Sequence, residues 1–315
     1  MDALQPNIEH GTIEGFDAVT LAAGPLEASF VPRLGMAGAS LRHTGAELLD
    51  RRAGLAAYRD RGAVMGVPLL HPWANRLARD ELVVHGRRVR LPGPPLVRRD
   101  EHGLPIHGML GAHPAWSVHE VDADGHAARL IARFDFADDP RLVAAFPFPH
   151  ELAVEASLSP RALRIATTVR ATGDVAVPIA FGYHPYLRIP GAERADWEVR
   201  LPPRRHLALD ASGLPTGART PEDAAQLRLG DLGFDDGYDG VADGARFSVT
   251  GGGREIVVTF ERGYPAAQVF SPPGAPFVCF EPMTAPTNAL SSGDGLRAVL
   301  PGRAYTAAFS IGVLT

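Results

Sequence analysis

Residues 151–170 alternate apolar and polar side chains with a period of two, the pattern that gives a β-strand one buried and one solvated face. The turn-forming residues 159–162, Ser-Pro-Arg-Ala, divide this stretch into two strands and so predict an antiparallel hairpin. Helical periodicity is scarce in the rest of the chain, and the 34 Gly and 28 Pro are spread over its whole length. The fold is therefore expected to be mainly β, with many short strands joined by turns.

Other segments fit the same expectation. Residues 26–49 are short apolar runs broken by Pro and Gly, residues 254–260 alternate after a three-glycine hairpin turn, and residues 304–313 are strand-like. A chain of 315 residues has room for two domains, but large all-β folds reach this length as one. Neither a shift in composition nor a repeat marks a boundary, so we expect one domain over residues 1–315.

The composition excludes several chemistries. The chain has no lysine, so all 31 basic residues are arginine. Schiff-base catalysis, a pyridoxal phosphate link and a Walker A phosphate loop all need a lysine. The formal net charge of −5 provides no basic footprint for nucleic acid and no polybasic anchor for a membrane surface. A small neutral partner fits this charge better.

The cysteine count and the N-terminus bear on the compartment. Cys279 is the only cysteine, which excludes an intramolecular disulfide and a cysteine zinc cluster. Residues 1–7 lack a basic start followed by an apolar stretch, so no signal peptide is expected, and no apolar run approaches the ~20 residues of a membrane helix. We therefore expect a cytoplasmic protein, monomeric or homodimeric.

Glu281 is a carboxylate inside the otherwise apolar run 277–283. Strand alternation directs it to the same face as Phe277 and Cys279. Burial beside such groups raises the pKa of a carboxyl and makes it a better base near neutrality, while Pro282 holds the preceding backbone extended. The alternative is a structural carboxylate that is satisfied by backbone amides or an arginine.

Two further polar groups follow apolar stretches. His184 is surrounded by aromatic residues in the segment 181–187, and its ordinary pKa near 6.5 suits proton exchange, although a satisfied core histidine is the alternative. Asn75 and Arg76 end the apolar segment 66–76 and offer donors and an acceptor to oriented oxygens. The alternative there is a turn with a left-handed Asn and a solvated Arg. His71 and Trp73 are expected to pack in the core.

Three histidines raise the question of a metal. His102, His107 and His113 follow one another closely, but their spacing matches neither a helical zinc pair nor a Cys/His cluster, so no metal site is expected. The preceding residues 87–99, rich in Arg and Pro, are expected to form a solvated surface loop, with Arg98 and Arg99 in water.

Residues 234–240 form an acidic stretch flanked by aromatic residues and are expected to be a turn. Asp235 there could accept hydrogen bonds from sugar hydroxyls, and a plain Asx turn or a calcium-type loop are the alternatives. Gln268 lies just before the strand that carries Glu281. The chain has no Gly-x-Ser-x-Gly and no His-Glu-x-x-His motif, which disfavours a serine hydrolase and a zincin.

Taken together, these residues resemble the aldose 1-epimerase (galactose mutarotase) family. The resemblance covers nearly the whole chain and depends on ordered blocks of residues. The blocks are Asn75-Arg76, His107-Gly108 with Trp116, His184 with Tyr186, Asp235 with Tyr238, and Gln268 followed by Glu281 with Asn288. The chain has Met109 where classical members have a second glycine, and Pro-Trp precedes Ala74, which resembles a divergent bacterial branch.

The resemblance implies a large antiparallel β-supersandwich and an enzyme that interconverts the α and β anomers of a free aldose without a metal or organic cofactor. It implies Glu281 as base and His184 as acid. The residues implied to hold the sugar are Asn75, Arg76, His107, Tyr186, Asp235 and Gln268.

Three other functions stay open. A glycoside hydrolase would use Asp235 and Glu281 as its two carboxylates, but would leave His184 without a role. A sugar-binding protein would keep the fold without turnover. A hexose-6-phosphate 1-epimerase would need several converging arginines, whereas Arg76 is the one basic residue of the matched blocks. The sequence therefore favours a neutral sugar.

Overall fold

The computed structural model describes residues 5–315, so most of the N-terminal stretch for which no signal peptide is expected lies outside the described residues. The chain is built mainly from strands, as expected. Its helices are short, namely α1 (Gly54–Arg61), α2 (Pro140–Ala145), α3 (Ala289–Ser292) and the 3-10 turns η1 (Pro32–Leu34), η2 (Phe136–Asp138) and η3 (Arg194–Asp196). No helix within residues 5–315 is long and apolar enough to cross a membrane.

Three larger antiparallel sheets and two hairpin-sized ones contain the strands. The five-stranded sheet contains, in spatial order, β1 (Asn7–Ile13), β2 (Phe16–Ala23), β3 (Leu26–Val31), β4 (Ala37–His43) and β5 (Ala46–Glu47). The nine-stranded sheet contains β19 (Ala225–Arg228), β16 (Glu198–Leu201), β21 (Ala245–Gly251), β22 (Arg254–Arg262), β26 (Ala304–Leu314), β12 (Ala162–Ala171), β11 (His150–Leu158), β10 (Ala128–Asp135) and β9 (Ser117–Ala123).

The eight-stranded sheet carries the site described below. Its strands are β18 (Pro215–Glu222), β17 (Arg204–Leu209), β20 (Phe234–Asp239), β23 (Ala266–Ser271), β24 (Val278–Met283), β14 (Gly182–Tyr183) and β6 (Leu69–Leu70), with β15 (Tyr186–Leu187) also paired to β24. The two small sheets pair β13 (Val177–Ile179) with β25 (Arg297–Val299) and β7 (Glu81–Val84) with β8 (Arg87–Arg90).

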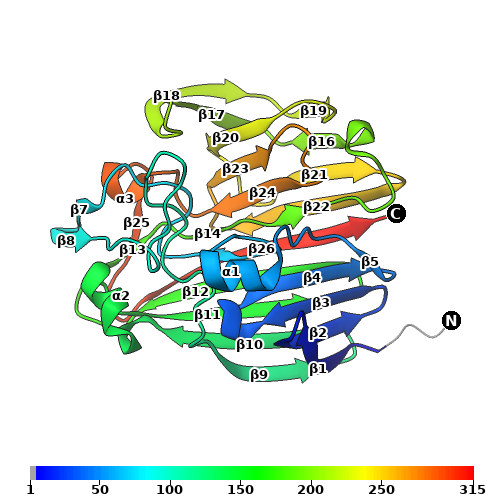
Figure 1. Cartoon of the computed structure of the whole chain (residues 1–315), viewed down its shortest axis with the longest axis horizontal. Coiled ribbons are helices and arrows are strands. Elements are labelled where there is room, and N and C mark those ends of the chain that lie inside the picture. The colour runs from blue at the N-terminus through cyan, green and yellow to red at the C-terminus, as the bar shows by residue number, and fades with distance from the viewer. Residues whose placement is uncertain (1–4) are drawn as a thin grey trace.

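The nine-stranded sheet is covered by the other two large sheets. The five-stranded sheet contacts its β9–β11 end, through β1, β2 and β3. The eight-stranded sheet packs on its middle, where Phe280 of β24 lies 5.7 Å from Phe247 of β21 between ring centroids. Figure 1 shows the blue strands β1–β4 beside the green strands β9–β12, and the orange strands β23 and β24 beside β21 and β22. The architecture is the large antiparallel sandwich that the sequence predicted.

The strongest hairpin of the sequence is confirmed. Strand β11 pairs with β12 in the expected register, Leu158 opposite Leu163, and every second residue of β11 is buried. The three-glycine turn joins β21 to β22, and the C-terminal strand β26 lies between β22 and β12. The period-two alternation therefore predicted both strands of this hairpin and the buried face of β11 correctly.

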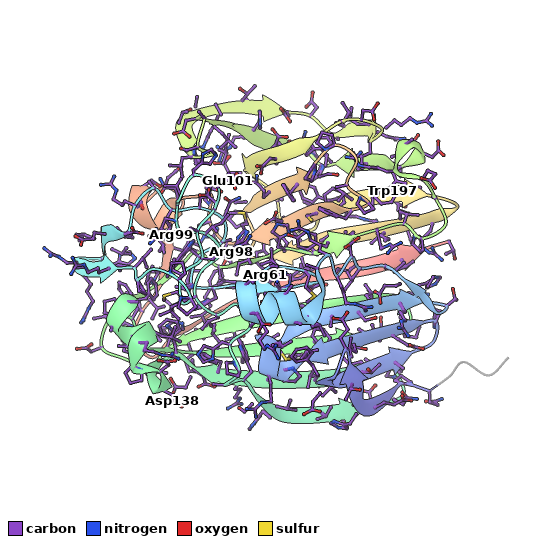
Figure 2. The ribbon with its side chains drawn as sticks, in the orientation of Figure 1. Arg61, Arg98, Arg99, Glu101, Asp138 and Trp197 are labelled. Atoms are coloured by element: carbon purple, nitrogen blue, oxygen red, sulfur yellow. The ribbon has the colours of Figure 1, made fainter. Side chains whose placement is uncertain are left out.

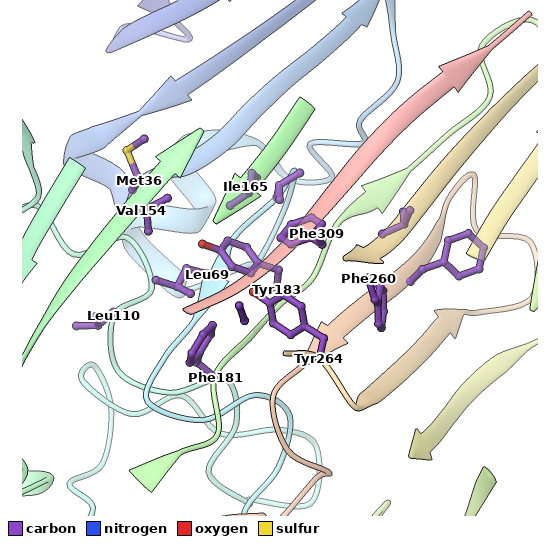
Figure 3. Close-up of a cluster of buried hydrophobic side chains, with 14 of the residues drawn as sticks. Met36, Leu69, Leu110, Val154, Ile165, Phe181, Tyr183, Phe260, Tyr264 and Phe309 are labelled. Carbon is purple, nitrogen blue, oxygen red and sulfur yellow. The ribbon is translucent and has the colours of Figure 1, made fainter. Parts of the chain in front are cut away.

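An aromatic cluster joins the layers beneath the site (Figure 3). Tyr183 lies 5.0 Å from Phe309 of β26 between ring centroids, and Phe181 contacts Tyr264 edge to face. The hydroxyl of Tyr183 is hydrogen bonded to Thr167 at 2.6 Å, so its polar end is satisfied. Burying an aromatic side chain of this kind contributes roughly 1.5–3 kcal/mol. The segment that leads to His184 is thereby fixed to the core.

Two local expectations were wrong. Residues 87–99 are not a solvated loop throughout, because residues 87–90 form β8, which pairs with β7, and Val89, Leu91 and Val97 are buried. Residues 234–240 are not a turn, because residues 234–239 form strand β20 inside the eight-stranded sheet. Both stretches are rich in charged residues, which hid their strands in the sequence pattern.

Candidate active site

A cavity of about 170 Å³, open to solvent, lies over the eight-stranded sheet. All eight residues proposed from the sequence line it: Asn75, Arg76, His107, His184, Tyr186, Asp235, Gln268 and Glu281. The other lining residues are Arg52, Val64, Arg98, Glu101, Ile106 and Phe270. Sequence segments that are up to about 230 residues apart therefore converge on one cavity.

The floor of the cavity comes from three neighbouring strands. Gln268 of β23 lies directly opposite Glu281 of β24, and Asp235 of β20 lies opposite Phe270. Directly paired residues project from the same face of a sheet, so these side chains share the cavity face. The other face of β24, which includes Phe280, packs on the nine-stranded sheet. Glu281 is thus held on a rigid central strand.

His184 reaches the cavity from the connection between β14 and β15. Its ring stacks on Tyr186 with centroids 4.3 Å apart and planes 6° apart, and Phe270 approaches it edge-on. The Nε2 atom lies 3.1 Å from Oε1 of Glu281 and 3.4 Å from the Tyr186 hydroxyl. Stacking and these contacts fix the ring in one orientation, with its Nε2 directed at the carboxyl group.

Glu281 and His184 are 1% and 5% exposed. Burial raises the pKa of Glu281 well above its ordinary value, with a further contribution from Asp235. Burial and the positive charge of Arg52 lower the pKa of His184 to about 3. Both shifts favour the neutral form of each group, which places the titratable proton of the pair on Glu281. Oε2 of Glu281 and Nδ1 of His184 are buried without a hydrogen-bond partner.

A left-handed turn presents His107 to the cavity. His107 and Gly108 both have positive φ, 65° and 73°, and a Cβ at Gly108 would lie 2.1 Å from the carbonyl oxygen of His71. Glycine is therefore required at position 108. Met109 is buried and donates its backbone amide to the carbonyl of His71 at 2.7 Å. The His107 ring meets His184 edge to face, and burial lowers its pKa well below the ordinary value.

The Asn75-Arg76 segment is a turn, but not a solvated one. Asn75 is left-handed with φ 56°, and its Oδ1 accepts the Arg76 amide at 2.8 Å. The Arg76 guanidinium is buried and donates to Asp100 at 2.6 Å and Glu101 at 3.2 Å, and it lies 4.0 Å from Asp235. The left-handed Asn of the alternative interpretation is thus present, while the solvated Arg is not. Arg76 aligns carboxylates around the cavity.

Asp235 stands at the cavity rim, about half exposed. Gln268 donates to its Oδ1 at 2.7 Å, and Arg76 opposes the rise in the pKa of this carboxyl that burial causes. Both partners hold this carboxylate, which lines the cavity.

Other residues of the sequence blocks serve the scaffold. Asn288 accepts the Ala78 amide at 2.9 Å and supports the Asn75-Arg76 turn. Tyr238 lies under the guanidinium of Arg204, and Trp116 packs on Phe134. None of these three lines the cavity.

The histidines that raised the metal question do not converge. His113 lies 3.3 Å from Asp139, and His102 is exposed outside the cavity, while His107 lines it. Among residues 5–315, no group of three or more His, Cys, Asp or Glu side chains is arranged to hold a metal ion. His71 and Trp73 are buried, as expected.

The sequence-based prediction of the site was incomplete for its arginines. Arg98 is half-buried and lines the cavity instead of lying in water, while Arg99 is ion-paired with Asp80 at 2.5 Å. Arg52 lines the cavity as well, and nothing in its sequence context marked it. Figure 2 shows Arg98, Arg99 and Glu101 on the connection between β8 and β9, next to α1. The fold alone brings this connection and the start of α1 to the cavity.

The fold and the cavity define a β-sandwich protein with a polar cavity lined by ionisable and hydrogen-bonding side chains. Comparison with solved structures agrees on the fold. A galactose mutarotase-like protein from Clostridium acetobutylicum superimposes with a TM-score of 0.88, 19% identity and 99% of both chains covered. Galactose 1-epimerase from Lactobacillus acidophilus NCFM gives a TM-score of 0.76 at 14% identity, again over 99% of both chains.

Sequence comparison identifies the family. The sequence profile of the family described as aldose 1-epimerase matches residues 17–312, and the chain belongs to that family. The chain is also 24% identical over 263 residues to YihR, an uncharacterised protein of Escherichia coli K12, which covers 78% of this chain and 80% of that protein. The resemblance stated from the sequence blocks is thus confirmed at the level of family and fold.

Proposed function

We propose that the protein is an aldose 1-epimerase that interconverts the α and β anomers of a free aldose. The observation that carries this proposal is the pair of Glu281 and His184, 3.1 Å apart and buried, at the floor of a polar cavity. Anomer exchange needs one group that takes a proton and another that gives one, both within reach of the same ring.

The proton transfers balance within this pair. Glu281 takes the proton of the C1 hydroxyl while His184 gives its proton to the ring oxygen, the bond from C1 to that oxygen breaks, and an aldehyde forms at C1. Rotation about the C1–C2 bond then presents the other face of the aldehyde. The ring oxygen attacks C1 and returns its proton to His184, and the C1 oxygen recovers its proton from Glu281.

Sugar binding prepares the pair for the first step. Burial favours the proton of the pair on Glu281, and no group of residues 5–315 is hydrogen bonded to Oε2. A hydroxyl that donates to Oε2 stabilises the ionised carboxylate, so the shared proton moves to His184, where the reaction needs it. Asn75, His107, Asp235 and Gln268 offer the remaining donors and acceptors for the ring hydroxyls.

The geometry favours this function over a glycoside hydrolase. The ionisable group in contact with Glu281 is His184, whereas Asp235 is held at the rim by Gln268 and Arg76 and is suited to binding. A sugar-binding protein would not need an acid-base pair at the floor of its cavity.

The test is the relaxation of freshly dissolved α-anomers of common aldoses, followed by polarimetry and by NMR exchange. The protein should accelerate relaxation without releasing reducing sugar from aryl glycosides. Glu281→Gln should abolish the acceleration while leaving sugar binding measurable by calorimetry. Equilibrium binding without acceleration by the wild type would identify a sugar-binding protein instead.

A further inference from the structure

The His184 ring is surrounded by ionisable and charged side chains from several parts of the chain. They are Glu281 of β24, Tyr186 of β15, His107 and Arg98 of the connection between β8 and β9, and Arg52 before α1. Burial lowers the pKa of His107 and raises the pKa of Tyr186, so both are uncharged near neutrality. The positive charge that acts on the ring comes first from Arg52 and, to a smaller extent, from Arg98. The proposed mechanism gives no role to either arginine.

Arg52 is held against aromatic rings. Its Nη1 donates to the Tyr186 hydroxyl at 3.3 Å, and its guanidinium lies 5.3 Å from the ring centroid of Tyr186 and 5.5 Å from that of Phe277. Within residues 5–315, no carboxylate lies within ion-pair distance of this guanidinium. An arginine on an aromatic face is held by cation–π attraction and keeps its charge. The positive charge of Arg52 is therefore not neutralised by an acidic side chain.

The backbone around Arg52 holds the side chain in this place. Arg52 is left-handed, with φ 47°, a conformation that residues other than glycine rarely adopt. Asp50 donates its backbone amide to the carbonyl of Tyr186 at 2.9 Å, and its Oδ1 accepts the backbone amide of Arg52 at 2.6 Å. Backbone strain of this kind persists where the surrounding structure fixes it, and it is common at functional sites. The segment is thus tied to Tyr186 at two points, its carbonyl and its hydroxyl.

A chain of hydrogen bonds leads from Arg52 to the acid. A guanidinium can only donate, so the Tyr186 oxygen accepts from Arg52 and keeps its own proton to donate. The other partner of this hydroxyl within the described residues is Nε2 of His184, at 3.4 Å. Nε2 can accept that proton only if it carries none itself, which requires a neutral ring with its proton on Nδ1. The contact with Tyr186 therefore favours neutral His184, as the charge of Arg52 does.

We propose that Arg52 is a positioning residue for His184: through the Tyr186 hydroxyl and through its own charge, it keeps the ring neutral until sugar binds and makes the protonated ring a stronger acid. The inference rests on the proposed function, in which His184 gives its proton to the ring oxygen of the sugar. A general acid has to carry a proton when the sugar is bound and then release it readily. Ionised Glu281 holds the proton on His184, and Arg52 with Tyr186 promotes its release.

The experiment measures the pH dependence of kcat/KM in the wild type and in Arg52→Met, with the aldose that the polarimetric screen shows to react fastest. Methionine removes the charge and the donors but keeps an unbranched side chain. The acid limb should move to higher pH by roughly half a unit or more, because one positive charge no longer opposes protonation of His184. The kcat at the optimum should fall about threefold to tenfold, because the weakened acid releases its proton less readily.

Two further variants separate the charge of Arg52 from the hydroxyl of Tyr186. Arg52→Lys keeps the charge and should keep the acid limb of the wild type. Tyr186→Phe keeps the stacking on His184 and removes the hydroxyl, so it should move the limb in the same direction as Arg52→Met. A rise in KM alone in Arg52→Met, with the limb unmoved, would assign Arg52 to sugar binding and overturn the inference.

A second readout does not depend on turnover. The ¹⁵N resonances of an imidazole show which nitrogen carries the proton, and His184→Gln identifies the resonances of this ring. At neutral pH the wild type should carry the proton of His184 on Nδ1, because Nε2 accepts from Tyr186. A proton on Nε2 would overturn the chain of hydrogen bonds and the inference with it.

Arg51→Met is the matched control, because Arg51 pairs with Glu14 at 3.0 Å and with Glu47 at 3.4 Å and does not line the cavity. It should leave the acid limb unchanged. An unmoved limb in Arg52→Met would overturn the inference while the proposed function stands. An equal shift in Arg51→Met would do the same, because the shift would then reflect general charge. Acceleration of no aldose by the wild type would overturn the proposed function and this inference with it.

Discussion

Two of the buried pairs of ionisable groups within residues 5–315 contain histidine side chains, and these two pairs differ in one respect. In the first, Nε2 of His71 lies 2.7 Å from Nε2 of His150, and in the second, Nε2 of His184 lies 3.1 Å from Glu281. Burial lowers the histidine pKa in both, to about 4 for His150 and to about 3 for His184. Each pair also leaves a ring nitrogen without a partner, Nδ1 of His71 in one and Nδ1 of His184 in the other.

The difference is access. His150 donates from Nδ1 to the carbonyl of Phe148 at 2.6 Å, and its ring stacks on Phe136 with centroids 4.3 Å apart. Its Nε2 must then accept from His71, so the pair forms a closed and neutral contact. The pair of His184 and Glu281 instead opens on the cavity. Burial, a shifted pKa and an unpaired nitrogen therefore do not mark a site by themselves, and a cavity beside them does.

The largest expected effect tests the open pair. Glu281→Gln keeps the shape of the side chain and removes the base, so kcat should fall by ~10²–10⁴ while the fold persists. NMR exchange measures the rate, and circular dichroism checks the fold. Glu261→Gln is the control, because Glu261 is ion-paired with Arg164 away from the cavity. More than about a tenth of wild-type kcat in Glu281→Gln would remove Glu281 from the mechanism.

The pH profile sharpens the comparison through the shared proton. Activity should require one titratable proton on the pair of Glu281 and His184. At low pH the pair carries two such protons, so kcat/KM rises with pH as the first of them is lost. At high pH kcat/KM falls as the remaining proton is lost. Because burial lowers the pKa of His184 to about 3, the acid limb should lie below the ordinary histidine pKa of about 6.5. Because burial raises the pKa of Glu281, the alkaline limb should lie above the ordinary glutamate pKa of about 4.3. An acid limb centred near 6.5 would show that His184 titrates as an exposed group.

The closed pair should respond in stability instead of activity. His150→Phe keeps the stacking on Phe136 and leaves His71 without its ring contact, which should cost about 1–3 kcal/mol of unfolding free energy. The kcat should change by less than about threefold. Urea unfolding and initial rates measure the two effects, with the exposed His119→Phe as control. A drop in kcat as large as that of Glu281→Gln would place the closed pair in the mechanism.

The same pair gives a pH dependence of stability with a definite sign. The folded-state pKa of His150, about 4, lies below the unfolded value of about 6.5, so between these values the unfolded state binds more protons. The unfolding free energy should therefore be constant above about pH 6.5 and decrease as the pH falls towards about 4. His150→Phe should reduce that slope, and an unchanged slope would assign it to other groups.

The smallest expected effect concerns metals. Exhaustive treatment with a chelator should leave the rate unchanged, because the proposed mechanism assigns both proton transfers to Glu281 and His184 and no group of metal-binding side chains gathers within residues 5–315. The readout is the relaxation rate before and after chelation. A loss that one added metal ion restores would assign His107 to a metal instead of to the sugar.

Much of this site was predictable because its residues interrupt patterns. Glu281 stands in an apolar strand, His184 among aromatic residues, and Asn75-Arg76 at the end of an apolar run. Burying a polar group costs free energy unless a partner compensates for the lost hydration. A polar residue inside an apolar run can therefore be recognised from the sequence as a candidate for a special role. Arg52 was missed because it follows Arg51 in a polar stretch before α1, where one more arginine carries no signal.

The sequence by itself determined the mainly β fold, the hairpin of β11 and β12, the family, and the eight predicted site residues that the fold brings to one cavity. Only the tertiary structure decided which charges face the cavity. It paired Arg76 with three carboxylates, placed Arg99 against Asp80, and left Arg52 and Arg98 facing the cavity without such partners. The physical reason is that alternation and burial depend on neighbours along the chain, whereas the neutralisation of a charge depends on groups that only the folded chain brings within a few ångströms.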